Sequence, residues 1–342
     1  MKRYTVGIVG AGFGVQAHLP ALRSHSRFEV AALASPSSAT RVAREQGIAH
    51  AFPSCAQMVA GVELDAVVIA SPPFAHLEDV LAALERRRHV LCEKPLGMRV
   101  SDVETMLEAS LAAGTACGVV HEFRFAPQAQ ALKELIDNGH LDPLRNLEIT
   151  MLRTSLRRHE RRPRSWWFER GRGGGLTGAV LSHLVDHANW LAGRRVERAV
   201  GFHRRANARR SDDAGEFESE VDDAGFALVQ YADELVARVT ADATTAVESY
   251  VCAAHGERRT AVASGPSILE LALFAVDGDR TDELECKPSP YARFESLGAN
   301  VPPLMELYDE FVRAMEGATN ALPTFDDALA TQRVLAAIGY GS

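Results

Sequence analysis

Lysine is scarce in this chain of 342 residues. The 37 basic residues include only four lysines, Lys2, Lys94, Lys133 and Lys287, and arginine takes the remaining cationic positions. A solvated surface charge can be either residue, but only lysine readily loses its proton, because an arginine side chain stays protonated in proteins. Lys94 directly follows the apolar run His89-Val90-Leu91-Cys92 and Glu93. A lysine where a buried strand ends is therefore a candidate for proton transfer.

Cysteine is rare as well. The five cysteines are an odd number, widely scattered, and without the spacing of metal ligands: Cys55, Cys92, Cys117, Cys252 and Cys286. This pattern predicts no disulfide framework and no zinc site, and it is typical of a reducing compartment. The first residues, Met1-Lys2-Arg3-Tyr4, lead at once into a strand pattern, so we expect no signal peptide and a cytoplasmic protein.

Long apolar runs and a basic excess are also missing. No run approaches the roughly 20 apolar residues that a membrane span needs, so no membrane partner is expected. The net charge of −8 argues against nucleic acid as the main partner. Two arginine-rich stretches, at 153–172 and 204–210, are explained by solvated loops, with an anionic ligand or a subunit contact as the alternative. The length is sufficient for two domains, each with its own core.

The first third of the chain alternates between strand and helix patterns. Continuous apolar runs are found at Thr5–Val9, Phe28–Ala34, Leu64–Ala70 and His89–Cys92. Such runs, separated by helical segments, are typical of a parallel sheet that is covered on both faces. We therefore predict an α/β dinucleotide-binding domain of the Rossmann type over residues 1–122.

The pattern changes after Pro127. A helix at Gln128–Asn138, a strand at Leu144–Leu152 and a helix at Leu176–Leu191 precede a long region, 196–284, with two-residue alternation. These features predict an α+β domain with a predominantly antiparallel open sheet over 123–303, followed by C-terminal helices over 304–342 that pack back on the body. The exposed face of such a sheet is apolar, so we expect it to pair with another subunit in a homodimer or homotetramer.

A glycine-rich turn follows the first strand. Gly10 and Gly12 occupy the first two positions of the Gly-x-Gly-x-x-Gly pattern, Val15 stands at the third, and Gly14 comes one residue early. The first two glycines allow a tight turn and a close approach of the backbone to a pyrophosphate at a helix N-terminus. Glycines also end strands for steric reasons alone. In this position we interpret the turn, with Phe13, as a cofactor-binding element.

The end of the second strand bears on the choice of cofactor. NAD-specific sites usually carry an Asp or Glu there for the ribose 2′-hydroxyl, but this strand ends without an acid. Ser35, Ser37 and Arg41 would suit a 2′-phosphate, which favours NADP(H) and leaves NAD(H) possible. The alternative is that the serines only cap the helix that starts near Ala39.

Several motifs, taken in order, resemble those of the Gfo/Idh/MocA family, the oxidoreductases similar to glucose–fructose oxidoreductase and inositol dehydrogenase. The match runs over nearly the whole chain. Its pieces are Gly10–Gly14 with His18-Leu19-Pro20, Ala70-Ser71-Pro72-Pro73 with His76, Glu93-Lys94-Pro95, Phe123-Arg124-Phe125-x-Pro127, and Gly173-Gly174-Gly175 before Ser182-His183-Leu184-x-Asp186. Each motif alone is weak, but the order and spacing are specific.

The resemblance implies roles for particular residues. Lys94 is implied as the general acid/base at the carbon that exchanges hydride with the nicotinamide, the Lys94–Pro95 bond as cis, and His183 as a second catalytic residue. A lysine ammonium neutralises the charge that develops on a ketone oxygen during reduction. The resemblance also implies Ser71, Pro72, His76, Glu93, Lys94 and Trp166 for the cofactor, and Glu122, Arg124, Trp167, Asp186 and His187 as candidates for the substrate. Trp166-Trp167 approximates the family's Trp–Arg pair, although the arginine is missing.

The chain departs from the family pattern one helical turn before His183. Many members carry an Asp there, where this chain has Ala179, and a methyl group accepts no hydrogen bond. Glu122 is a candidate for the missing carboxylate. His183 also has a purely structural interpretation, as a helix histidine that packs in the domain core. His183, Asp186 and His187 have the types of metal ligands, but we predict no metal because the family needs none.

Three functions remain open at this point. The first is an NAD(P)-dependent oxidoreductase, NADP(H) favoured, that acts on a hydroxyl or keto carbon of a sugar, cyclitol or similar polyol. The second is an enzyme without net redox change, in which a bound cofactor is recycled during epimerisation, elimination or glycoside cleavage. The third is a catalytically silent nucleotide-binding sensor, which Ala179 favours and which Lys94 and His183 oppose.

Overall fold

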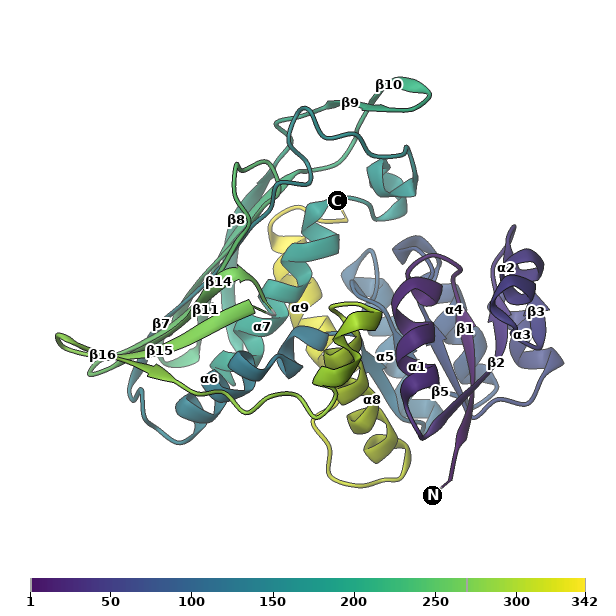
Figure 1. Cartoon of the computed structure of the whole chain (residues 1–342), viewed down its shortest axis with the longest axis horizontal. Coiled ribbons are helices and arrows are strands. Elements are labelled where there is room, and N and C mark those ends of the chain that lie inside the picture. Colours follow the sequence, from purple (N-terminus) through teal and green to yellow (C-terminus); the bar gives the residue numbers. More distant parts are fainter. Residues whose placement is uncertain (1, 269, 342) are drawn as a thin grey trace. The chain divides into compact units, whose positions relative to one another are not determined.

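A computed structural model describes residues 2–268 and 270–341 (Figure 1). The chain forms two compact units that are each built from two stretches of sequence. The first unit comprises Met1–Glu122 and Ser289–Leu329, and the second comprises Phe123–Pro288 and Ala330–Ser342. The C-terminal segment over 304–342 contributes residues to both units.

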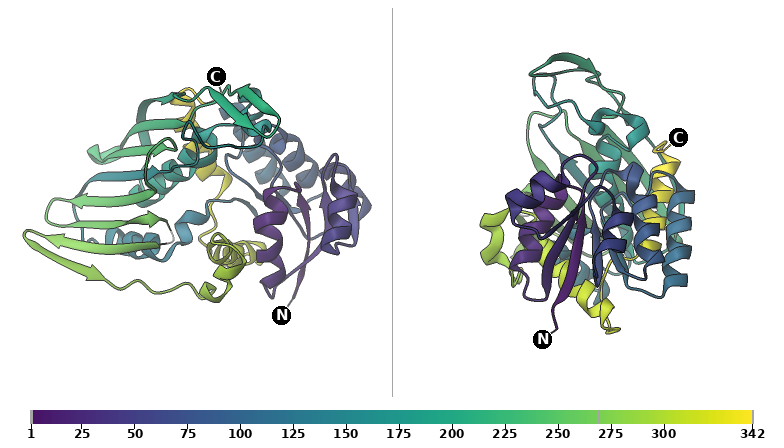
Figure 2. Two further views of the ribbon diagram at one scale, coloured as in Figure 1. Left: turned by 45° about the horizontal axis from the view of Figure 1, so that its top comes forward. Right: turned by 90° about the vertical axis from the view of Figure 1, so that its right-hand side faces the viewer.

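The first unit contains a parallel sheet of six strands in the order β3-β2-β1-β4-β5-β6. The strands are β1 (Tyr4–Val9), β2 (Phe28–Ala34), β3 (His50–Phe52), β4 (Ala66–Ile69), β5 (His89–Cys92) and β6 (Cys117–Val119). Helices lie on both sides of the sheet (Figure 2): α1 (Leu19–Ser24), α2 (Ala39–Gln46), α3 (Cys55–Gly61), α4 (Pro73–Glu85) and α5 (Val100–Ala113). This is the doubly wound order expected from the sequence. Its direction reverses between β1 and β4, where ligands bind in such sheets.

Burial explains why these runs become strands. Val6 and Ile8 of β1 and Val67 and Val68 of β4 are fully buried, which requires cover on both faces of the sheet. A further helix, α8 (Val301–Met315), returns from the C-terminal part of the chain and packs against α1. The first unit therefore includes a C-terminal helix that the sequence pattern did not assign to it.

The second unit contains a sheet of eight strands in the order β16-β15-β14-β13-β7-β12-β11-β8. The strands are β7 (Leu144–Leu152), β8 (Val196–Arg204), β11 (Ala224–Tyr231), β12 (Val236–Asp242), β13 (Ser249–Gly256), β14 (Thr260–Ser267), β15 (Glu270–Asp277) and β16 (Arg280–Leu284). Neighbouring strands are antiparallel except for β7 and β12, which are parallel. The expectation of a predominantly antiparallel sheet is confirmed.

One face of this sheet is covered by α6 (Pro127–Asp137) and α7 (Ser182–Ala192) (Figure 1). On β8 and β11, Val200, Phe202 and Leu228 are exposed, and the strand register pairs Leu228 with Val200 and Phe226 with Phe202. Side chains that are directly opposite on paired strands share a face, so these form one apolar patch. A patch of this kind is what the expected self-association would cover.

A separate hairpin, β9 (Arg209–Asp212) and β10 (Gly215–Glu218), interrupts the path from β8 to β11. Its Phe217 ring packs edge-on against Phe168, with ring centroids 5.0 Å apart. Among residues 2–268 and 270–341, none of the helices combines the length and the hydrophobicity that a transmembrane span requires.

Candidate active site

The glycines of the turn after β1 differ in whether the packing around them requires glycine. At Gly10, φ is +105° and a Cβ would lie 2.3 Å from the Ala70 carbonyl oxygen, so only glycine fits. At Gly14 a Cβ would lie 2.8 Å from Cγ2 of Ile8. At Gly12, in contrast, a Cβ would meet nothing within 4 Å. Packing does not explain Gly12, whereas close approach of a pyrophosphate does, so the turn fits a dinucleotide.

The turn leads directly into a helix. The amides of Val15 and Gln16 donate to the Gly12 carbonyl at 3.1 and 3.0 Å, and a π-helical turn over Gly14–His18 continues into α1. The first amides of a helix have no partner within the helix and carry its positive dipole end. The turn therefore offers backbone donors to an anionic group. Phe13 is 36% exposed beside it.

The side chains after β2 suit a 2′-phosphate if Arg41 leaves its present partner, Glu45. Ser35 Oγ lies 2.9 Å from Ser38 Oγ, and Ser37 is exposed. Arg41 is paired with Glu45 one turn along α2, at 2.8 Å. Exposed pairs of this spacing contribute only about 0.3–0.5 kcal/mol, so Arg41 can leave Glu45 for a stronger anion. Ser38, at the start of α2, makes no side-chain cap hydrogen bond.

The carboxyl ends of β1, β4 and β5 meet at one edge of the sheet. The register pairs Val9 with Ile69 and Ile69 with Cys92, so the segments that follow these residues are neighbours. They are the glycine turn, the Ser71–Pro72 segment that precedes α4, and Glu93-Lys94-Pro95. The sequence motifs for the cofactor and for Lys94 therefore lie together.

His76 links two of these segments. Its ring is fully buried, with Nε2 2.7 Å from the Ser71 carbonyl oxygen and Nδ1 3.1 Å from the Pro95 carbonyl oxygen. Burial lowers the pKa of His76, against the effect of these backbone contacts and of Glu93. The Ser71 hydroxyl in turn donates to Asp79 Oδ2 at 2.7 Å. His76 thus connects the backbone segments that follow β4 and β5, and its own ring is shielded from solvent.

Glu93 and Lys94 directly follow β5, at the carboxyl edge of the sheet. The Lys94–Pro95 bond is cis, as the resemblance implies. Glu93 is buried, its Oε1 lies 2.9 Å from His18 Nε2, and its Oε2 accepts the Lys94 amide at 3.2 Å. Burial alone would raise the pKa of Glu93, but the hydrogen bond from His18 and the Lys94 charge outweigh it and lower that pKa. Glu93 is therefore an ionised acceptor beside Lys94.

In the second unit, the glycine triplet allows two segments to approach. A Cβ at Gly174 would lie 2.1 Å from the Trp167 carbonyl oxygen, and one at Gly175 would lie 2.4 Å from Asp222 Oδ1. Asp222 accepts the amide and hydroxyl of Thr177 at 2.7 and 2.8 Å. The triplet thus fixes the chain between Trp166–Trp167 and the helical turn that leads into α7.

Trp166 and Trp167 are half-buried in a short 3₁₀ turn, Trp166–Phe168. The guanidinium of Arg162 lies 4.5 Å from the centroid of the Trp167 ring. Most neighbouring arginines are paired with carboxylates, for example Arg153 with Glu248 and Arg157 with Glu160. The sequence did not single out Arg162, because cation–π partners have no fixed spacing along the chain.

The three candidates on α7 have different environments. His183 stacks on Phe123, with centroids 4.1 Å apart and an interplanar angle of 10°. Arg124 donates hydrogen bonds from Nε and Nη2 to the carboxylate of Asp186, at 2.8 and 2.6 Å, and both side chains are buried. His187 Nδ1 lies 3.0 Å from the Tyr250 hydroxyl. Arg124 and Asp186, both predicted as substrate residues, thus bind each other.

Ala179 and Glu122 belong to different units. Ala179 lies in the helical turn Thr177–Leu181 before α7, and Glu122 is the last residue of the first stretch of the first unit, where it is buried. Replacement of the family Asp by Glu122 stays a prediction. Within residues 2–268 and 270–341, no three His, Cys, Asp or Glu side chains are grouped as metal ligands.

The buried His187 leads to a prediction about pH and stability. Burial lowers its pKa from 6.5 to about 4, with Asp186 opposing and Arg124 adding to the shift. The unfolded chain then binds more protons than the folded one below pH 6.5, so the free energy of unfolding falls as the pH falls from about 6.5 to about 4. The full contribution is on the order of 3 kcal/mol.

Chemical denaturation between pH 4 and pH 7 measures this effect. His187→Asn keeps an acceptor near the Nδ1 position but does not titrate, so its unfolding free energy should depend less on pH than that of the wild type. The comparison also cancels Asp79, whose pKa is raised to about 6 by burial and which acts in the opposite direction. Equal pH dependence in both proteins would show that His187 titrates normally.

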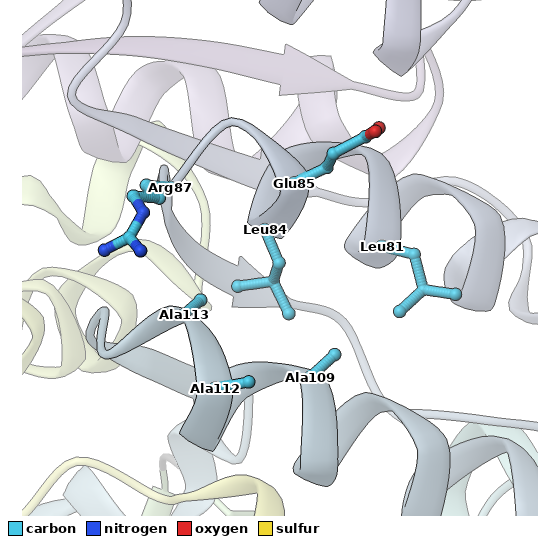
Figure 3. A pocket seen from close by; sticks show the side chains of 7 residues that line it. All are labelled: Leu81, Leu84, Glu85, Arg87, Ala109, Ala112 and Ala113. Atoms are coloured by element: carbon cyan, nitrogen blue, oxygen red, sulfur yellow. The ribbon is translucent and has the colours of Figure 1, made fainter.

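A hollow of about 390 Å³ lies apart from these residues, between α4 and α5 (Figure 3). Its walls are mostly aliphatic: Leu81, Leu84, Glu85, Arg87, Ala109, Ala112 and Ala113. None of the candidate site residues lines it. It is not the candidate active site.

Comparison with known proteins agrees with this arrangement. Residues 4–121 match the family model of the GFO/IDH/MocA oxidoreductases, described as an NAD-binding Rossmann fold, and residues 129–262 match the C-terminal domain of the same family. An uncharacterised oxidoreductase of Synechocystis is 36% identical over 193 residues, which are 55% of this chain and 51% of the relative. D-xylose 1-dehydrogenase (NADP(+)) 2 of Haloferax volcanii is 38% identical over 133 residues, 38% of this chain and 41% of the relative.

These curated relatives are matched over about half of their length or less. Among solved structures, levoglucosan dehydrogenase in complex with NADH superposes with a TM-score of 0.86 over 99% of this chain and 97% of the other, at 21% identity. That likeness shows the fold. Because models of both family domains match in sequence order, the chain belongs to the Gfo/Idh/MocA family of oxidoreductases.

Proposed function

We propose that this protein is an oxidoreductase that uses NADP(H) in preference to NAD(H) and acts on a hydroxyl or keto carbon of a sugar, cyclitol or similar polyol. The observation that carries the proposal is the position of Lys94 at the carboxyl edge of β5, beside the glycine turn with its open space at Gly12. The names of the relatives, D-xylose 1-dehydrogenase (NADP(+)) and levoglucosan dehydrogenase, support the substrate class.

The residues of this chain have defined tasks in such a reaction. The glycine turn and the first amides of the following helix bind the pyrophosphate. A bound nicotinamide supplies or accepts the hydride. Lys94 Nζ donates a proton to the substrate oxygen during reduction of a ketone and accepts the alcohol proton in the other direction. We assign His183 as the second catalytic residue, on the family motif in which it lies.

The preference for NADP(H) can be tested by fluorescence titration with NADPH and NADH. Ser35→Asp places a carboxylate where a 2′-phosphate would bind, so it should weaken NADPH binding by at least about tenfold and favour NADH. Arg41→Ala should weaken NADPH binding alone, because NADH lacks the 2′-phosphate. Arg44→Ala, on the same helix, is the matched control. Tighter binding of NADH than of NADPH by the wild type would contradict the preference.

A second candidate function rests on Ala179, which replaces the family's Asp. It is a nucleotide-binding protein without turnover. A screen of polyols and keto sugars with NADP⁺ and NADPH separates the two. Tight cofactor binding with no turnover of any compound would support this candidate, whereas a rate that depends on Lys94 would exclude it.

A further inference from the structure

A buried chain of hydrogen bonds runs from helix α8 to the Lys94 segment. The Tyr308 hydroxyl lies 2.7 Å from His18 Nδ1, and His18 Nε2 lies 2.9 Å from Glu93 Oε1. Tyr308 and His18 are fully buried, and Glu93 is 6% exposed. All three side chains, and Lys94, belong to the first unit.

The chemistry of Tyr308 and Glu93 limits which groups can donate the hydrogen bonds of this chain. Burial, with a smaller effect of Glu93, raises the pKa of Tyr308 well above 10, so the phenol keeps its proton and is able to donate it to Nδ1 of a neutral His18. An imidazole that accepts at Nδ1 carries its proton on Nε2. Nε2–H then donates to Glu93, which is ionised and can only accept.

The other oxygen of the same carboxylate continues the chain. Glu93 Oε2 accepts the backbone amide of Lys94 at 3.2 Å. The carboxylate is therefore held at one oxygen by a ring from the glycine-turn helix and at the other by the residue proposed as the acid/base. A carboxylate has further lone pairs, so it can still accept hydrogen bonds from a bound cofactor.

We propose that Tyr308 and His18 are positioning residues, in which the Tyr308 hydroxyl fixes His18 as an Nε2–H donor so that the Glu93 carboxylate is fixed for the cofactor beside Lys94. The cofactor half of this inference rests on the proposed function. Neither residue touches the reacting atoms in this account, and both act through Glu93. On this proposal helix α8 supports the cofactor site through Tyr308, although Tyr308 is 290 positions from His18 in sequence.

The same interface contains a natural control. His25 Nε2 lies 3.2 Å from Asp309 Oδ1, and the Tyr291 hydroxyl donates to Asp309 Oδ2 at 2.8 Å. This pair also joins the helix α1 region to the C-terminal segment, but it does not contact Glu93 in any hydrogen bond described above. Tyr291→Phe therefore removes a phenol from the same interface while leaving Tyr308, His18 and Glu93 in place.

The test uses the intact protein with two independent measurements. Two-bond ¹H–¹⁵N correlation spectra report the tautomer of His18, assigned with His18→Gln among the 12 histidines. We expect the Nε2–H tautomer in the wild type and in Tyr291→Phe, and a mixture of tautomers in Tyr308→Phe. A wild-type His18 that carries its proton on Nδ1, or on both nitrogens, would overturn the proposed direction.

Titration with NADPH is the second measurement. Tyr308→Phe should weaken binding about three- to tenfold, the effect of one hydrogen bond, and Tyr291→Phe should change it less than twofold. His18→Gln keeps a donor toward Glu93, so it should bind NADPH better than His18→Leu, and this pair replaces Tyr308→Phe if that variant does not fold. Equal effects of Tyr308→Phe and Tyr291→Phe, or of the two His18 variants, would overturn the positioning role.

Failure of this inference differs from failure of the proposed function. If the wild type binds NADPH and the positioning variants bind it equally well, the inference fails and the function stands. If the wild type binds neither NADPH nor NADH, the proposed function fails together with the cofactor half of the inference. The tautomer of His18 still decides whether Tyr308 sets the direction of the chain.

Discussion

Replacement of Lys94 by alanine is expected to lower turnover by about two to four orders of magnitude, the usual effect of losing a general acid or base. The reason is that Lys94 follows β5 at the sheet edge where the glycine turn and the Ser71–Pro72 segment also lie. The measurement is the steady-state rate with a polyol or keto sugar found by screening. NADPH affinity should change much less than the rate, since the backbone of the glycine turn binds the pyrophosphate.

Two matched variants make this result specific to proton transfer. Lys94→Arg keeps the positive charge but cannot release its proton at neutral pH, so its rate should remain close to that of Lys94→Ala. Lys287→Ala removes an exposed lysine from the second unit and should leave the rate unchanged. A rate for Lys94→Ala within a few-fold of the wild type would exclude Lys94 as the acid/base.

Local patterns were sufficient to predict the framework of the first unit. The apolar runs became β1, β2, β4 and β5, and the glycine turn lies between β1 and its helix as expected. These features depend on residues close together in sequence, namely continuous burial of a strand and a positive φ at Gly10. The cis bond before Pro95 was also expected, from the resemblance.

Contacts between distant residues could not be predicted. Nothing near His18 indicates that Tyr308 is its partner, and the Arg124–Asp186 pair joins residues 62 positions apart. The position of β7 between β12 and β13 is set by long-range pairing, with one parallel neighbour that the alternating pattern does not reveal. The alternation over 196–284 also does not reveal that β9 and β10 form a separate two-stranded sheet. Pattern indicates which side chains are buried, but not which distant partner they meet.

Among the ion pairs of the second unit, we expect Arg124–Asp186 to contribute most to the free energy of unfolding. Both guanidinium contacts are short, and the side chains are 7% and 1% exposed. Arg124→Met removes the charge that faces both oxygens of Asp186 while keeping much of the buried volume. Loss of one partner from a buried pair typically destabilises a protein by about 3–5 kcal/mol. We expect the free energy of unfolding to fall by this amount. Urea denaturation, followed by fluorescence and circular dichroism, measures the change.

The exposed pair Arg238–Glu148, which joins β12 and β7, supplies the control for this measurement. Its side chains are 58% and 39% exposed, so Arg238→Met should reduce the free energy of unfolding by less than about 1 kcal/mol. The double variant Arg124→Met with Asp186→Leu removes both buried charges and should recover much of the loss, because apolar groups of similar volume can replace a buried pair. If Arg124→Met is no more destabilising than Arg238→Met, the buried carboxylate does not depend on Arg124. A large loss without recovery in the double variant would instead assign the effect to packing around the α7 helix.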